Sequence, residues 1–193
     1  MASIVHHKQR HSGRTVYHLP AHRNLNGEQA MATRLTPAQL LEQNHYCVLS
    51  TCDRFGTPWS TPLFYTYDDH WQVYWISALS SRHSRLIAEN PQGSVVIYQP
   101  PGVSAEASAL FLSGPVSVCT PDEVERGLEL YFERTGLGVS GRAADYLGES
   151  LCRIYRMETW TAYTLGEPEW EGNLLLDKRV EVPVPGQAGR SAS

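Results

Sequence analysis

The stretch Cys47–Gln99 decides the fold, and it reads CVLSTCDRFGTPWSTPLFYTYDDHWQVYWISALSSRHSRLIAENPQGSVVIYQ. β-branched and aromatic residues, which favour extended backbone, gather in four runs in or beside it: 46–51, 57–67, 71–77 and 93–99. Short turns at Asp53–Gly56 and Asp68–His70 join the first three runs. This spacing predicts an antiparallel meander, followed by a short helix over 81–90 that Pro91 ends, and then the fourth strand.

The chain on either side extends this pattern. Before it, Thr36–Gln39 combines a capping threonine, a proline at the first helical position and a capping-box glutamine, which predicts a helix. Pro58 and Pro62 predict that the second strand is an edge, a bulge or a ligand-facing stretch. Six or seven antiparallel strands with a few peripheral helices predict a mainly β (α+β) fold built on a closed or partly closed barrel. The later strands are expected over 108–119, 151–157 and 160–165, and the later helices over 120–134 and 143–147.

Length and composition are those of a single domain. We expect this domain over 35–181, preceded by a polar N-terminal arm over 1–34 and followed by a disordered tail over 182–193. The formal net charge of −4 argues against a general nucleic-acid binder, which needs a basic footprint. No apolar run is as long as a membrane span and the N-terminus has no secretory h-region, so we expect no membrane partner and a cytoplasmic protein.

The cysteines and histidines do not predict a metal site. The four cysteines form no CxxC pair, which favours free thiols in a reducing compartment over disulfides or metal ligands. His7 and His11 are four residues apart and could share a helix face, but solvated side chains in a tail explain them better. No GxSxG, P-loop or HExxH motif is present, and the sequence singles out no catalytic residue.

The start of the 81–90 helix is the strongest candidate for a binding feature. A helix N-terminus leaves backbone N–H groups unpaired and carries a partial positive charge, so it receives anions and above all phosphate. Ser81, Arg82 and His83 place a hydroxyl, a guanidinium and an imidazole around this end. Two plainer interpretations stay open: His83 is a polar residue of a solvated first turn, and Arg82 pairs with Glu89 on the surface.

With these residues in view, the chain resembles the pyridoxamine-phosphate-oxidase-like family of FMN-binding split barrels, over roughly residues 36–165. The resemblance implies an antiparallel split β-barrel, a homodimer, and FMN bound at the subunit interface. It rests on the order and spacing of several short segments, which are Phe55-Gly56-Thr57-Pro58, Tyr74–Ser77, Ser81-Arg82-His83, Asn90-Pro91, Phe111–Val116 and Arg153–Arg156.

The resemblance also implies a set of cofactor-binding residues. Arginine suits the phosphate because it can bind a dianion bidentately. Trp75 and Trp59 could instead be packing residues of the barrel. The implied set is Thr61, Pro62, Leu63 and Phe64 along the isoalloxazine ring, Trp75, Ile76 and Ser77 beside the ring and ribityl chain, and Ser81, Arg82 and His83 at the phosphate.

The chain departs from true pyridoxamine phosphate oxidases. Those enzymes have basic residues near the positions of Thr61 and Thr66, a lysine near that of His83, and an Arg-x-His pair after the last strand, where this chain reads GEPEWEGNLLLDKR. If the His83 imidazole must be charged, phosphate binding depends on pH. We therefore expect an FMN-dependent oxidoreductase acting on a small, conjugated substrate, and no pyridoxamine phosphate oxidation. The alternatives are an F420-dependent reductase and a flavin- or haem-binding carrier or sensor without turnover.

Overall fold

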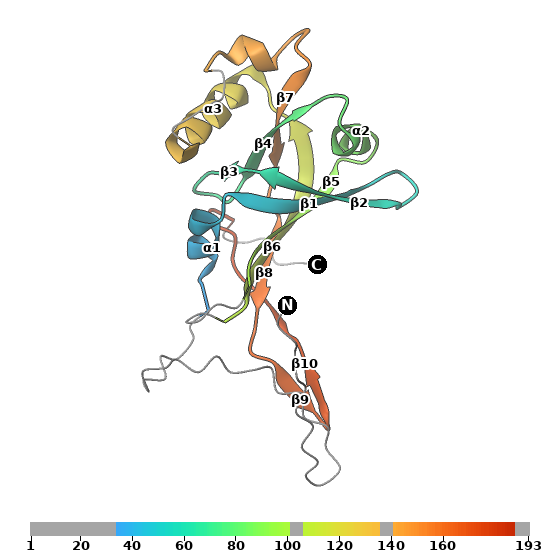
Figure 1. Ribbon diagram of the computed structural model, residues 1–193, viewed down its shortest axis with the longest axis vertical. Coiled ribbons are helices and arrows are strands. Elements are labelled where there is room, and N and C mark those ends of the chain that lie inside the picture. Colours follow the sequence, from blue (N-terminus) through green and yellow to red (C-terminus); the bar gives the residue numbers. More distant parts are fainter. Residues whose placement is uncertain (1–33, 101–105, 136–140, 188–193) are drawn as a thin grey trace, which may run out of the picture.

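The computed structural model describes residues 34–100, 106–135 and 141–187 (Figure 1). All but the last residue of the predicted N-terminal arm therefore lies outside the described residues. The helices are α1 (Pro37–Gln43), α2 (Arg82–Glu89), α3 (Pro121–Thr135) and the 3-10 helix η1 (Ala143–Tyr146). The strands are β1 (Tyr46–Cys52), β2 (Pro58–Phe64), β3 (Thr66–Tyr67), β4 (Val73–Ala78), β5 (Gln92–Gln99), β6 (Ser108–Val118), β7 (Cys152–Met157), β8 (Thr161–Leu165), β9 (Glu169–Glu171), β10 (Leu174–Leu176) and β11 (Arg179–Glu181).

The strands form an antiparallel sheet that curls into a half-barrel, so the chain has the mainly β split-barrel fold that the sequence predicts (Figure 1). The main path runs β2-β1-β5-β6-β7-β4-β3, and β8 leaves it by pairing with β6 and β11. Among the described residues this sheet has nine strands, because the predicted 57–67 strand is divided into β2 and β3 and because β11 was not predicted. Only Tyr65 separates β2 from β3, so the chain itself brings the two ends of the sheet together.

Local sequence signals account for the boundaries of the first elements. Thr36 Oγ1 accepts a hydrogen bond from the N–H of Gln39, whose side-chain oxygen accepts one from the N–H of Thr36 at 2.9 Å, which is the predicted capping box of α1. In the β1–β2 turn, Asp53 Oδ1 accepts hydrogen bonds from the N–H groups of Phe55 and Thr57 at 2.8 and 2.9 Å. These short-range bonds position the meander that the sequence predicts.

β6 is the strand that joins the two parts of the half-barrel. Its first part pairs with β8 and its last part with β7, while β5 pairs with it from Ser108 to Pro115. The change of partner takes place at Gly114, where a Cβ atom would lie 1.8 Å from the carbonyl oxygen of Glu158. Glycine is therefore required here, because the connection between β7 and β8 passes directly over the β6 backbone.

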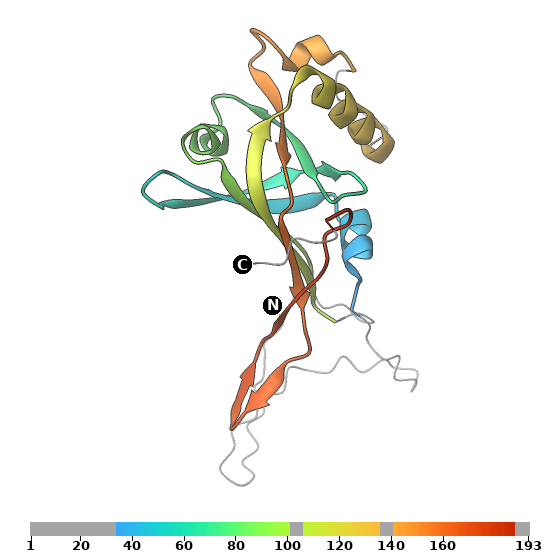
Figure 2. The same cartoon turned by 180° about the vertical axis from the view of Figure 1, so that it is seen from behind.

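Two apolar clusters hold the fold together. Trp75 is fully buried inside the barrel, together with side chains from β1, β5, β6 and β7. A second cluster lies between α3 and the other face of β4 and β7, where Val124 and Tyr131 of α3 pack with Ile154 of β7. α2 and α3 lie on opposite sides of the sheet in both views (Figures 1 and 2). None of the helices in the described ranges is long and apolar enough to cross a membrane.

The C-terminal part of the chain differs from the sequence-based prediction. β9 and β10 form a hairpin that projects from the barrel (Figures 1 and 2). The sequence-based prediction places the start of a disordered tail at residue 182, but the first residues of this segment are packed. Val184 is buried in the main core, and the Val182 N–H donates to Ala162 O at 2.9 Å. The valines supply apolar surface, and the prolines have no backbone N–H that burial could leave unpaired. The segment VPVPG can therefore pack at the edge of the core without regular secondary structure. Residues 188–193 lie outside the described ones.

Candidate functional site

The barrel opens where β2 runs past β4. The β3–β4 register pairs Thr66 with Tyr74 and Tyr67 with Val73, and continuing it would pair Phe64 with Ile76. Instead, the hydroxyl of Tyr131 stands between these two residues: it accepts the N–H of Ile76 at 3.0 Å and donates to the carbonyl of Phe64 at 3.3 Å. We call this opening between β2 and β4 the seam.

The seam leaves one edge of β2 available to a ligand. Within the described part of the chain, β2 pairs with β1 and lies at the end of the sheet. This confirms that the proline-containing strand is an edge strand. Alternate backbone groups of such a strand point away from its neighbour and can bind a ligand. The hydroxyl oxygen of Thr61 on this strand is also buried without a hydrogen-bond partner among the described residues.

α2 follows β4 and packs against β1 and β2, which brings its N-terminus to one end of the seam. Ser81 is the N-cap, and its Oγ accepts the N–H of Ser84 at 3.3 Å. The His83 imidazole points inward: its Nε2 lies 2.7 Å from Ser77 Oγ and 3.1 Å from Ser81 Oγ. Ser77, Ser81 and His83, which the sequence singled out separately, thus form one hydrogen-bonded cluster that ties α2 to β4.

Burial sets the charge of this cluster. His83 is only 7% exposed, and desolvation lowers the pKa of its imidazole below the ordinary value of 6.5. The imidazole is therefore neutral at pH 7. A direct charge contact from His83 to a phosphate, which the sequence suggested, would require this ring to gain a proton and leave Ser77. In the present arrangement its contribution is to hold Ser81 and the first turn of α2.

Arg82 supplies the free positive charge at this end of α2. Its guanidinium lies 4.3 Å from the ring centre of the half-exposed Trp59 on β2, a cation–π contact that orients it. No carboxylate pairs with Arg82 in the described ranges, so the surface pair with Glu89 is not formed. The neighbouring Arg85 donates to Ser80 O at 2.5 Å. A guanidinium without an anionic partner, next to a helix N-terminus, is suited to bind phosphate.

Most of the remaining predicted residues use their side chains for packing. Trp75 is fully buried and stacks on Tyr155 at 5.7 Å, so its side chain packs the barrel interior and does not face a ligand. Leu63 also faces the core, whereas Pro62 is exposed. Phe64 packs against the Tyr131 ring at 5.6 Å. Tyr131 was not among the predicted residues, because its partners lie 55 and 67 residues away along the chain.

A cleft of about 550 Å³ lies elsewhere, on the outer face of the sheet. A row of small hydroxyl side chains crosses it on the paired strands β1, β5, β6 and β8, where Ser113 and Thr161 form a hydrogen bond of 2.5 Å. Ser60 of β2 extends this row beyond the cleft by a hydrogen bond of 3.2 Å to Ser50. Trp160, which is 46% exposed, stands at its side. None of the described residues that line this cleft is charged. These residues therefore offer hydrogen bonds but no positive charge to an anion.

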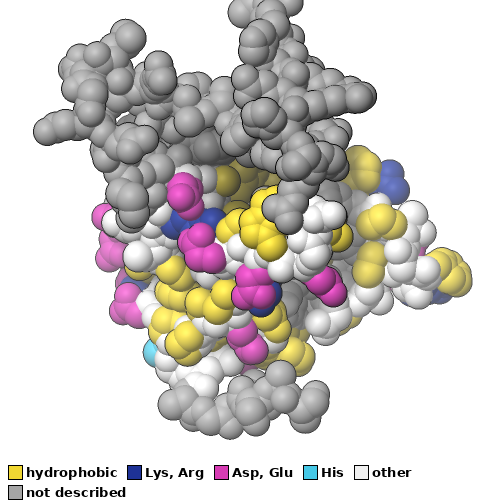
Figure 3. Space-filling model, turned by 90° about the horizontal axis from the view of Figure 1, so that it is seen from below, with side chains coloured by type: hydrophobic (Ala, Val, Ile, Leu, Met, Phe, Trp, Pro, Cys, Tyr) yellow, Lys and Arg dark blue, Asp and Glu magenta, His cyan; other side chains and the backbone are white. Residues whose placement is uncertain are grey.

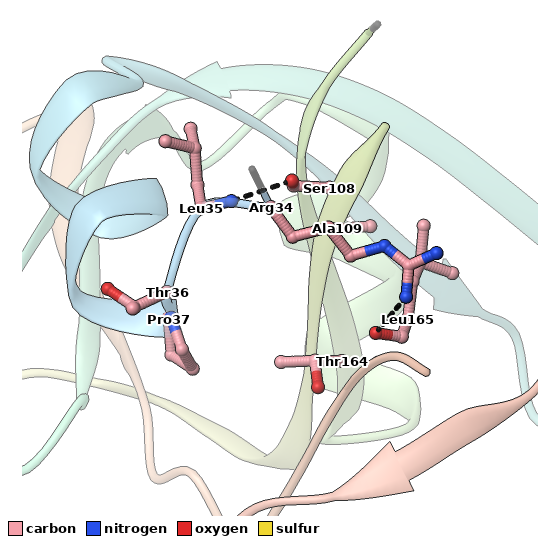
Figure 4. Close-up of a pocket in the computed structure, with 8 residues that line it drawn as sticks. All are labelled: Arg34, Leu35, Thr36, Pro37, Ser108, Ala109, Thr164 and Leu165. Carbon is pink, nitrogen blue, oxygen red and sulfur yellow. Dashed lines mark hydrogen bonds between the residues drawn. The ribbon is translucent and has the colours of Figure 1, made fainter. Parts of the chain in front are cut away.

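A smaller pocket of about 180 Å³ lies where the segment before α1 meets β6 and β8 (Figure 4). The Leu35 N–H donates to Ser108 Oγ at 2.9 Å, and Arg34 reaches toward the carbonyl of Leu165 (Figure 4). Arg34 also pairs with Glu106 at 3.1 Å and with Glu167 at 3.2 Å. Arg34, the charged side chain among the described lining residues, is thus already paired with carboxylates.

Charge and metal ligands are sparse in the described part of the chain. Seen from below, acidic side chains are scattered among hydrophobic ones, and the coloured residues of this face form no continuous basic surface (Figure 3). No group of three or more metal-ligating side chains occurs in the described ranges. The four cysteines are free thiols, as the sequence indicated.

Comparison with known proteins agrees with this geometry. A family model described as pyridoxamine 5′-phosphate oxidase matches residues 37–146, which is more than half of the 193 residues. The chain belongs to this family. A search of curated proteins gave no match.

Solved structures show the same fold at low sequence identity. A protein of unknown function from Agrobacterium tumefaciens is 22% identical with a TM-score of 0.52, over 70% of this chain and 55% of that one. The chain thus spans little more than half the length of that relative. A haem-binding protein from Mycobacterium smegmatis is 15% identical (TM-score 0.54, 76% of this chain and 60% of that one). The haem storage protein HutZ from Vibrio cholerae is 17% identical (TM-score 0.51, 64% and 87%).

Proposed function

We propose that this member of the family binds FMN in the seam and is an FMN-dependent oxidoreductase acting on a small, conjugated substrate. The observation that carries the proposal is the placement of Arg82. Among the described residues, Arg82 has no carboxylate partner, and it lies at the N-terminus of α2 next to β2, whose second edge is unpaired in this part of the chain. The N-terminus of α2 thus suits a phosphate dianion, and the edge of β2 suits a flat ring that can form hydrogen bonds with the backbone.

The residues that would hold FMN follow from this arrangement. Arg82 and the backbone N–H groups after Ser81 would bind the phosphate, with His83 holding this turn in place. The backbone of 61–64 and the Thr61 hydroxyl would receive polar atoms of the ring or ribityl chain. Bound FMN supplies hydride and single-electron transfer, while the protein binds and orients it and excludes water. We add a homodimer with the cofactor at the subunit interface, which the resemblance implies, and we propose a cytoplasmic location.

The substrate is proposed to differ from pyridoxamine phosphate. Thr66, which stands where the true oxidases have a basic residue, is 2% exposed, and its hydroxyl donates to Leu130 O at 3.1 Å. It therefore offers no charge to a substrate phosphate. The segment after β8, where those enzymes carry an Arg-x-His pair, forms the β9–β10 hairpin, with Glu169 and Trp170 exposed. These features favour an uncharged or weakly charged substrate.

The proposal is tested by titrating the purified protein with FMN and with riboflavin, which lacks the phosphate, and following the quenching of flavin fluorescence. We expect both to bind and FMN to bind more tightly. Failure to bind either flavin would refute the proposal. F420 and haem are titrated in parallel. Tighter binding of F420 would favour the reductase alternative, and binding of haem instead of flavin would favour a carrier or sensor.

The structure provides some grounds for ranking these alternatives. A longer phosphate tail such as that of F420 needs additional cations, but Arg85 is occupied by the carbonyl of Ser80, and the basic residues of the N-terminal arm lie outside the described residues. Haem usually needs an imidazole ligand, whereas His83 is bonded to Ser77 and Ser81, and His45 lies flat against Phe64 with ring centres 6.0 Å apart. These contacts favour FMN.

A further inference from the structure

The hydroxyl of Tyr131 occupies a place where the barrel would otherwise close. In the continued β3–β4 register, Phe64 O and the Ile76 N–H would form a direct main-chain hydrogen bond. A phenol hydroxyl can accept one hydrogen bond and donate another, so it satisfies both groups without letting them meet. Two consecutive bonds of 3.0 and 3.3 Å replace one direct bond. The hydroxyl therefore holds the strands apart by a fixed amount.

The tyrosine is itself held firmly. Its side chain is 3% exposed in the cluster between α3 and β4, and its ring contacts that of Phe64. Next to it on α3, the carbonyl of Leu130 accepts the hydroxyl of Thr66 on β3, which anchors the helix to the closed part of the barrel. Burial also raises the pKa of the Tyr131 phenol, so the hydroxyl keeps its proton and can donate at any physiological pH.

We propose that Tyr131 is a positioning residue that sets the width of the seam and thereby keeps the free edge of β2 open for the ring of a bound flavin. This inference rests on the proposed function, since the ring is that of FMN. Without the hydroxyl, Phe64 O and the Ile76 N–H are left unpaired or drawn together, and in either case the edge at 61–63 loses its spacing from β4.

The test compares Tyr131→Phe with a matched control, Tyr74→Phe. Both substitutions remove one hydroxyl from a buried tyrosine of the same cluster, but the hydroxyl of Tyr74 donates to Asp68 at 3.2 Å, away from the seam. The first readout is hydrogen exchange of the Ile76 amide. We expect it to become about tenfold faster or more in Tyr131→Phe and to stay unchanged in Tyr74→Phe.

The second readout is flavin affinity. Because the inferred defect lies at the ring, Tyr131→Phe should weaken FMN and riboflavin by the same factor, about tenfold. A general loss of stability would instead appear in both Tyr→Phe variants. The proposal is overturned if Tyr131→Phe binds both flavins like the unmodified protein, or if its Ile76 amide stays protected.

The unmodified protein provides a test that needs no variant. A hydroxyl locked between two backbone groups exchanges slowly with water, so an NMR resonance of the Tyr131 hydroxyl proton with a cross-peak to the Ile76 amide is expected. Its absence while other buried hydroxyls are visible would count against the proposal. If the unmodified protein binds no flavin, the proposed function fails, and so does the part of this inference that concerns the flavin ring. The signals of the Ile76 amide and the Tyr131 hydroxyl still decide whether Tyr131 bridges the seam.

Discussion

Replacing Arg82 by glutamine should weaken FMN binding and leave riboflavin binding unchanged. The guanidinium is exposed, has no carboxylate partner among the described residues, and is held over Trp59 at 4.3 Å. A hydrogen bond between charged partners contributes about 1.5–3 kcal/mol, and exposure to water places this one near the lower limit. At about 1.4 kcal/mol per factor of ten, we expect FMN affinity to fall about 10- to 30-fold.

Fluorescence titration with both flavins measures this effect, and Arg126→Gln provides the control. That substitution makes the same change in net charge on α3, where Arg126 forms a surface pair with Glu129 at 3.3 Å. It should leave both affinities within about twofold of the unmodified protein. The reasoning would be refuted if Arg82→Gln bound FMN as tightly as the unmodified protein, or if it lost riboflavin to the same extent as FMN.

Three further predictions concern stability and reactivity. Burial lowers the pKa of His83, so below about pH 6.5 the unfolded chain binds a proton more readily than the folded chain. The free energy of unfolding should therefore decrease as the pH falls through this region. His83→Gln should reduce this pH dependence, which urea titrations measure. Gly114→Ala should cost about 4 kcal/mol or more, because the new Cβ would lie 1.8 Å from the carbonyl oxygen of Glu158. The thiols of Cys47 and Cys119 should react with maleimide at about pH 8 only after unfolding, since burial raises the pKa of each to about 12.

Each of these predictions has a result that would contradict it. A pH dependence of unfolding that is unchanged in His83→Gln would contradict the role of burial. Gly56→Ala places a methyl group in open space at a φ of +85° and should cost about 1–2 kcal/mol, so a similar loss in Gly114→Ala would contradict the steric argument. Fast labelling of Cys47 in the folded protein would show that its strand opens readily.

The features that could be predicted from the sequence are those that depend on neighbouring residues. The capping box at Thr36, the Asp53 turn and the Ser81 cap all involve partners within four positions along the chain, and each is formed in the structure. The runs of β-branched and aromatic residues, joined by short turns, likewise predicted the meander. The family resemblance directed attention to β2 and to the start of α2, and the structure places both beside the same opening.

The features that could not be predicted depend on distant partners. Nothing in the sequence around Tyr131 indicates that its hydroxyl meets Phe64 and Ile76, because only the barrel topology brings them together. The inward direction of the His83 ring and the burial of Trp75 also follow from tertiary packing. At Val184 the sequence-based prediction was disorder, because the surrounding segment is rich in proline, but the chain folds back and buries this residue in the core.

The most direct test of the central claim is a visible absorption spectrum of the purified protein, combined with mass identification of the chromophore released by heat. The account predicts the absorption bands of an oxidised flavin and a released compound with the mass of FMN. A haem spectrum would contradict it. A colourless protein that takes up neither FMN nor riboflavin would contradict it as well, because Arg82 and the open edge of β2 would then serve some other ligand.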